Sequence, residues 1–142
     1  MGRFWLLGLI AVLSACARTP DEQRIRAAVT SMQHAAEQRQ PRAFMAHVSE
    51  DFIGNDDPGF DRAALLNLLR VEVLRNDEVN VLLGPIEVDL QGDRATVHVT
   101  ATITGGKGSL LPERGAVYDI TSGWRREGRD WICYSGRWKQ DL

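Results

Sequence analysis

The stretch RATVHVTATIT, residues 94–104, alternates apolar and polar side chains over its whole length. Its apolar side chains are those of Ala95, Val97, Val99, Ala101 and Ile103. Threonines and His98 fill most of the positions between them. Because successive side chains of a strand point to opposite faces of a sheet, the pattern predicts a strand with one buried face and one threonine-rich polar face. His98 is therefore expected to point away from the core.

Further strands are predicted on both sides of this stretch. Residues 79–83 and 86–90 come before it, and residues 116–126 and 130–140 come after it. The last two strands meet at residues 127–128, Glu-Gly, which predicts a hairpin.

The register of that hairpin decides which side chains face the core. With Glu127-Gly128 as a two-residue turn, one face carries Tyr118, Ile120, Ser122, Trp124, Trp131, Cys133, Ser135 and Arg137. The opposite face then carries Asp119, Thr121, Arg125, Ile132, Tyr134 and Trp138. We expect the first face to line the core because it makes the better apolar surface. A slip of one residue would exchange the faces of one strand.

A helix is predicted to begin at Thr19-Pro20. Thr19 is a favourable N-cap, Pro20 suits the first helical position, and Glu22 completes a capping box. Apolar residues then recur at helical spacing as far as Ala36.

Two more helices are predicted before the strands begin. Residues 42–48 form a short one after Pro41, and Asp61 caps another that is rich in leucine. The segment between them, residues 54–59, contains Gly, Asn, Asp and Pro and predicts a loop. Helices followed by strands predict an α+β domain.

The amino-acid composition excludes some classes of function. The chain has 142 residues, a net charge of −2, and 44% hydrophobic and 25% charged residues, which suits one globular domain. It has no basic block, and nucleic-acid binding needs clustered Lys and Arg to displace phosphate counterions. The three histidines, His34, His47 and His98, are too scattered to indicate a metal site, and no cofactor is predicted.

The amino-terminal sequence, MGRFWLLGLIAVLSAC, has the organisation of a secretion signal. Arg3 gives it a basic start, an apolar stretch covers 4–13, and the small residues Ser14 and Ala15 precede Cys16. The apolar stretch is shorter than the roughly 20 residues needed to span a bilayer. A buried helix of the fold is the alternative, but the stretch is apolar all round.

The tetrapeptide Leu-Ser-Ala-Cys that ends at Cys16 resembles the lipobox of bacterial lipoproteins. The resemblance implies a diacylglycerol on the Cys16 sulfur, cleavage just before it, and acylation of the new amino terminus with a fatty acid such as palmitate. It implies a signal peptide at 1–15, a lipidated tether at 16–20 and a domain at 21–142. The protein is then anchored through lipid at the cell envelope.

The residue after the lipobox bears on location. Ala17 is not the aspartate of an inner-membrane retention signal, so the periplasmic face of the outer membrane is expected rather than the inner membrane. Cys133 has no cysteine partner if Cys16 carries lipid, and we expect it to pack as a small buried apolar residue. A disulfide between the two cysteines is the alternative.

In order and spacing of its elements, the chain resembles the nuclear transport factor 2-like superfamily over residues 21–140. The resemblance is carried by the first helix, by Ala43-Phe44 in the second, by Glu50-Asp51-Phe52, and by Gly-Arg-Asp-Trp at 128–131. It implies an α+β cone in which amino-terminal helices pack on a curved antiparallel sheet and leave a pocket. Members include ketosteroid isomerase, scytalone dehydratase, SnoaL-like cyclases and non-catalytic binding or assembly domains, so the fold alone does not choose a function.

Binding rather than catalysis is the expected function. No catalytic residue is predicted, because the inward face of 94–104 carries no titratable side chain. The candidate ligand contacts are Tyr118, Trp124, Ser135 and Arg137. A charge at Arg137 on the core face would need a partner, which suggests an anionic group on an apolar ligand. A surface position or an internal ion pair is the alternative for Arg137, and packing is the alternative for the tryptophan.

Three functions stay open at this stage. We favour a membrane-anchored domain that binds a small apolar or anionic ligand or a protein partner. The alternative is a SnoaL-like isomerase, dehydratase or cyclase, which would place an Asp, Glu or His in the pocket. Assembly through the sheet is the third. A homodimer is also predicted, through an outer patch of Ile132, Tyr134 and Trp138.

Overall fold

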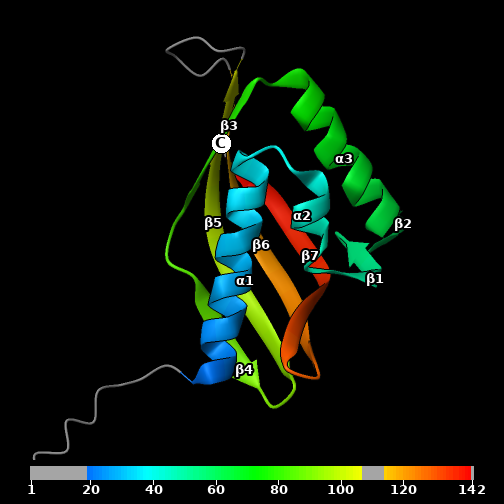
Figure 1. Ribbon diagram of the computed structural model, residues 1–142, viewed down its shortest axis with the longest axis vertical. Coiled ribbons are helices and arrows are strands. Elements are labelled where there is room, and N and C mark those ends of the chain that lie inside the picture. The colour runs from blue at the N-terminus through cyan, green and yellow to red at the C-terminus, as the bar shows by residue number, and fades with distance from the viewer. Residues whose placement is uncertain (1–18, 107–113, 142) are drawn as a thin grey trace, which may run out of the picture.

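The computed structural model describes residues 19–106 and 114–141 (Figure 1). These residues form helices α1 (Pro20–Glu37), α2 (Pro41–Met45) and α3 (Arg62–Arg75). Their strands are β1 (Val48–Gly54), β2 (Asp57–Asp61), β3 (Glu78–Leu83), β4 (Glu87–Gln91), β5 (Arg94–Gly106), β6 (Arg114–Glu127) and β7 (Asp130–Asp141). Cys16 and the predicted signal peptide lie outside the described residues. No helix within the described residues is long and apolar enough to cross a membrane.

One curved sheet contains the strands of the described chain, in the order β2-β1-β7-β6-β5-β3, with β4 also paired to β5. The helices lie along one side of this sheet (Figure 1). The predicted α+β cone is therefore confirmed. One detail differs: β1 and β7 run parallel, so the sheet is mixed rather than wholly antiparallel.

Strand β5 has the predicted alternation. Ala95, Val97 and Ala101 are 4%, 0% and 1% exposed, whereas His98 is exposed on the opposite face. β5 pairs with β6 in an uninterrupted register from Arg94↔Arg125 to Gly105↔Arg114. This long pair forms the rigid back of the cone.

Helix α1 begins where its capping sequence predicts. The Thr19 Oγ1 accepts a hydrogen bond from the Glu22 N–H at 3.2 Å, and Pro20 occupies the first turn. The Glu22 carboxylate bonds to Arg26 Nη2 at 2.9 Å, one helical turn further on. Asp21 Oδ1 accepts from the indole N–H of Trp131 at 3.0 Å, which fastens the start of α1 to β7.

The other half of α1 covers the β3 edge of the sheet. Gln33 Nε2 donates to the Val81 carbonyl oxygen at 2.7 Å, and Glu37 Oε2 accepts from the Val81 N–H at 3.4 Å. Both backbone groups of Val81 are thus satisfied at a position where an edge strand would otherwise be open.

The β6–β7 hairpin turns at other residues than predicted but keeps the predicted faces near the turn. Glu127 pairs with Asp130, so the turn residues are Gly128, with a φ of 64°, and Arg129, rather than Glu127 and Gly128. Near this turn the predicted faces hold: Trp124 pairs with Cys133, and these side chains are 1% and 4% exposed.

A β-bulge at Tyr134 reverses the faces of β7 beyond that point. Trp124 pairs with Cys133, but the next residue back, Gly123, pairs with Ser135. The extra residue shifts the alternation of β7 by one position. The prediction that Arg137 faces the core is therefore wrong, and Trp138, predicted to lie outside, packs against the core instead.

Strands β1 and β2 replace the end of a predicted helix and a predicted loop. Helix α2 ends at Met45, and β1 starts at Val48, which pairs with Cys133 of β7. Asn55 and Asp56 have φ angles of 51° and 55°, as in the left-handed pair of a two-residue hairpin turn. The polar residues after β1 therefore make a tight hairpin rather than a loop.

Candidate functional site

A pocket of about 570 Å³ lies between the helices and the inner face of the sheet. Most of its lining side chains are apolar, among them Val29, Met32, Phe44, Leu69, Val73, Val99, Ile103 and Ile120. The volume falls within the range of roughly 300–1,000 Å³ that is usual for small-molecule sites. The pocket can therefore accept an organic ligand of ordinary size.

The pocket has a closed end and an open end. Phe52, Val97 and Trp124 line the closed end, and none of these side chains is more than 3% exposed. Leu68 and Arg75 of α3 line the other end and are exposed. A ligand would therefore enter beside the second half of α3.

Polar side chains of α3 and the residue after it lie at the open end. Glu72 Oε1 is 3.8 Å from Arg75 Nη1, and Glu72 Oε2 accepts from Asn76 Nδ2 at 3.3 Å. The same Asn76 nitrogen donates to the Glu72 carbonyl oxygen at 2.9 Å, so the amide of this 5%-exposed side chain is held by Glu72. A Cβ at Gly105 would lie 2.7 Å from Asn76 Oδ1, so the strand can approach Asn76 only with a glycine here.

Two hydroxyl groups of β6 also line the pocket, those of Tyr118 and Ser122. Ser122 pairs with Val97 of β5 and with Gly136 of β7, which places it at the closed end. Its Oγ accepts a hydrogen bond from the indole N–H of Trp124 at 2.8 Å.

Cys133 lines the same end as a free, buried cysteine, as predicted. Burial raises the pKa of its thiol to about 12, and the thiol donates to the Ser135 carbonyl oxygen at 3.2 Å. The group is therefore a neutral thiol at ordinary pH and not a nucleophile.

The structure brings together two of the four predicted ligand contacts. Tyr118 and Trp124 line the pocket, whereas Ser135 and Arg137 do not. Arg137 is a surface residue with a side chain 67% exposed, and its Nη1 lies 3.4 Å from Asp56 Oδ2.

Sequence analysis did not single out Glu72, Asn76 or Ser122. Glu72 and Asn76 are four residues apart, or about one helical turn. The surrounding leucines of α3 predict only packing, so nothing in the sequence marks this pair as part of a site. Ser122 was assigned to the correct face, but nothing in the sequence marked its hydrogen bond with Trp124.

The histidines lie away from the pocket lining. His98 Nδ1 is 3.1 Å from Thr121 Oγ1 on the outer face, and His34 is exposed. His47 Nε2 is 3.1 Å from Ser31 Oγ, and partial burial lowers the pKa of His47. Within residues 19–106 and 114–141, no three His, Cys, Asp or Glu side chains gather in a way that could hold a metal ion.

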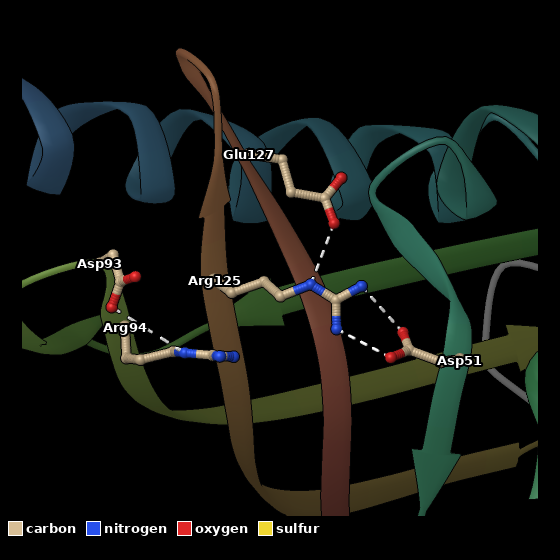
Figure 2. A network of polar contacts seen from close by, with 5 residues as sticks. All are labelled: Asp51, Asp93, Arg94, Arg125 and Glu127. Carbon is tan, nitrogen blue, oxygen red and sulfur yellow. Dashed lines mark hydrogen bonds and ion pairs between the residues drawn. The ribbon is translucent and has the colours of Figure 1, made fainter.

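A polar network on the outer face links β6 to β1 across β7 (Figure 2). Arg125 donates to both carboxylate oxygens of Asp51 at 2.9 Å and to Glu127 at 3.0 Å. The Arg125 guanidinium lowers the pKa of Asp51 to about 2. The Tyr134 ring lies against the guanidinium groups of Arg94 and Arg125, at 5.4 and 5.8 Å. These groups are engaged with one another, which indicates a structural role.

No family profile matches the chain, and no curated protein matches it in sequence. Solved structures match it closely in shape. A proposed dehydratase of the nuclear transport factor 2-like family from Streptomyces avermitilis superposes with a TM-score of 0.71 at 20% identity, over 87% of this chain and 99% of that one. The fold is nuclear transport factor 2-like.

Two further structures show the same nuclear transport factor 2-like fold in different settings. A protein of unknown function from Pseudomonas putida gives a TM-score of 0.73 at 18% identity, over 88% of this chain and 89% of that one. Bd1075 from Bdellovibrio bacteriovorus gives 0.71 at 15% identity over 84% of this chain, which spans only 41% of Bd1075. Identities this low establish the fold and leave function to be argued from the site.

Proposed function

We propose that this nuclear transport factor 2-like domain binds a small, neutral, mainly apolar molecule and does not convert it. The supporting observation is the distribution of polarity in the pocket. Its closed end is formed by Phe52, Val97 and Trp124, and the charged Glu72 and Arg75 are kept near the open end. General acid–base catalysis needs a titratable group at the reacting atoms, and the Cys133 thiol at the closed end stays neutral because of its raised pKa.

The ligand is neutral in this proposal because the argument for an anionic one depended on Arg137. That side chain is on the outer surface beside Asp56. Arg75 is the lining residue with a permanent positive charge, and it lies at the exposed end within 3.8 Å of Glu72. A buried anionic group would therefore lose its hydration without gaining a counter-charge.

Filling the pocket tests the proposal. Val99→Trp places a large side chain in the cavity, and His98→Trp makes the same addition on the exposed outer face. With N-phenyl-1-naphthylamine as a neutral fluorescent probe, we expect saturable binding to the wild type and to His98→Trp, and loss of binding in Val99→Trp. A wild-type protein that shows no saturable binding of neutral apolar probes would contradict the proposal.

An enzyme remains the second candidate because one carboxylate, Glu72, lines the pocket. The Streptomyces avermitilis protein of the same fold is a proposed dehydratase, which keeps a SnoaL-like isomerase, dehydratase or cyclase in view. Saturable turnover of a small ketone, epoxide or polyketide that is lost in Glu72→Gln would establish this alternative over simple binding.

We also propose that lipid on Cys16 anchors the domain at the cell envelope. Since α1 begins at Pro20, the tether of residues 16–20 has four residues before the helix, which reach at most about 14 Å. The start of α1 and the β6–β7 turn would then face the membrane, and the second half of α3 lies toward the opposite end of the domain (Figure 1). Cys16→Ser should abolish fatty-acid labelling and precursor processing. Continued labelling and membrane binding of this variant would refute the anchor.

A further inference from the structure

We propose that Ser122 selects ligands that carry a carbonyl oxygen, by donating a hydrogen bond to that oxygen at the closed end of the pocket. This inference rests on the proposed binding of a neutral apolar ligand and specifies which polar group that ligand carries and where. It assigns Ser122 a specificity-determining role in binding.

The hydrogen bond from Trp124 leaves the Ser122 hydroxyl with a free hydrogen. A serine hydroxyl has one donor hydrogen and two acceptor lone pairs. The Trp124 indole N–H, 2.8 Å away, uses one lone pair and restrains the position of Oγ. No hydrogen bond among the described residues uses the Ser122 hydrogen. A hydroxyl that accepts a hydrogen bond also becomes a better donor.

The described side chains around Ser122 offer no other free hydrogen-bond donor at the closed end. Its cross-strand neighbours on β5 and β7 are Val97 and Gly136, which have no polar side-chain atom. The Cys133 thiol already donates to the Ser135 carbonyl oxygen. Tyr118 is four residues away along β6, which separates the two Cα atoms by about 13 Å, so the two hydroxyl groups belong to different levels of the pocket.

The open end favours the same orientation of the ligand. The amide nitrogen of Asn76 already donates to the backbone and the side chain of Glu72, and the Glu72 carboxylate repels a second oxygen. Arg75, the other donor at this end, is exposed to water and lies 3.8 Å from Glu72 Oε1, so a carbonyl oxygen gains more from the water-excluded hydroxyl of Ser122. The ligand enters with its carbonyl first.

The selectivity for a carbonyl arises because a ligand without this oxygen leaves the Ser122 hydroxyl unpaired. A ligand that has this oxygen replaces the hydrogen bond that water makes to Ser122, whereas a hydrocarbon of the same shape leaves a desolvated donor unpaired. Sites built around such a donor reject the analogue that lacks its partner.

A matched pair of fluorescent probes tests this directly. 6-Propionyl-2-dimethylaminonaphthalene has the carbonyl, and 6-propyl-2-dimethylaminonaphthalene has a methylene in its place. Both are titrated against the full chain carrying Cys16→Ser, in which the apolar leader is identical for every variant and cancels in the comparison. We expect the wild-type pocket to prefer the ketone by about fivefold, the size of one net hydrogen bond.

Substitutions then locate the preference. Ser122→Ala should remove it by weakening the ketone alone, and Ser122→Thr, which keeps a hydroxyl, should retain it. Ser135→Ala makes the same deletion outside the pocket, and Tyr118→Phe removes the other β6 hydroxyl of the lining; neither should change the ratio.

The outcomes separate this inference from the proposed function. If the two probes bind the wild type equally, or if Tyr118→Phe rather than Ser122→Ala removes the preference, the role of Ser122 is refuted while binding in the pocket stands. If neither probe binds, the proposed function fails and the inference fails with it. If Ser122→Ala does not fold, equal binding of the two probes by the wild type still refutes the inference, and a preference that persists in Tyr118→Phe and Ser122→Thr still supports it.

Discussion

Cys133 should be unreactive in the folded protein and reactive only after unfolding. In a Cys16→Ser background it is the only thiol of the chain. Its side chain is 4% exposed, and burial raises its pKa to about 12. At pH 8 about one such thiol in 10⁴ is ionised, compared with about a quarter of free cysteine with a pKa near 8.5. Because the thiolate is the reacting species, ionisation alone should slow labelling by a factor on the order of 10³.

The assay is absorbance on reaction with 5,5′-dithiobis(2-nitrobenzoic acid), with and without denaturant. We expect one equivalent of thiol in denaturant and almost none within minutes in native buffer. The control is Arg137→Cys in a chain that also carries Cys16→Ser and Cys133→Ala. It places a thiol at an exposed position of the same strand and should react at once. Native labelling of Cys133 at the rate of that control would refute both its burial and the register near the turn.

Four other perturbations test the packing and the outer face. Cys133→Ala should lower the free energy of unfolding by about 1 kcal/mol, measured in urea, because a small buried group is lost beside an existing pocket. Gly54→Ala would place a Cβ 2.6 Å from Phe60 Cδ1 and 2.8 Å from Trp138 Cη2, so it should lower the free energy of unfolding by about 1–3 kcal/mol. In the control Gly115→Ala the nearest contact of the new Cβ is 3.5 Å, so the loss should be much smaller. Asp51 has a pKa of about 2 beside Arg125, below the unfolded value of about 3.9, so its contribution to stability is complete above about pH 5 and is lost as the pH falls toward 2. Asp51→Asn should therefore flatten the acid side of the stability profile, and an unchanged profile would show that the contact with Arg125 contributes nothing. A homodimer through the outer face stays a prediction, and its expected patch is now Ile132 and Tyr134 because Trp138 packs inward. Light scattering should show a dimer that Ile132→Arg dissociates. A monomer at high concentration would contradict this prediction.

The parts of the fold that sequence predicts well are those fixed by local chemistry or by long alternation. Thr19 and Asp61 cap α1 and α3 as expected, because a side-chain oxygen beside unsatisfied N–H groups acts within one helical turn. β5 alternates without interruption, and its inward residues Ala95 and Val97 are buried as predicted.

The parts that sequence misses depend on pairing partners far along the chain. β1 exists because Val48 pairs with Cys133 of β7, and no local pattern in residues 48–54 announces that partner. Propensity alone therefore predicts a longer second helix and a loop at residues 54–59.

The bulge on β7 shows how an unpredicted pairing changes the expected residues of the site. Counting alternate residues from the turn places Cys133 correctly and Arg137 wrongly, because Tyr134 adds a residue that has no partner on β6. Because of this one extra residue, Trp138 faces the core and Arg137 faces the solvent. The reason to expect an anionic ligand is therefore lost.

The polar chemistry of the pocket is set at a finer level than alternation can reach. Alternation places Ser122 on the inward face, but a serine there could equally bond its own backbone or stay without a function. What distinguishes it is that Trp124, two residues on and on the same face, takes one lone pair of its oxygen. The hydroxyl hydrogen is then left without a partner beside an apolar cavity, where an unmatched donor costs most. The choice of ligand in this fold thus depends on the balance of donors and acceptors around a single side chain, which follows from the packing of Trp124 and not from the pattern of the strand.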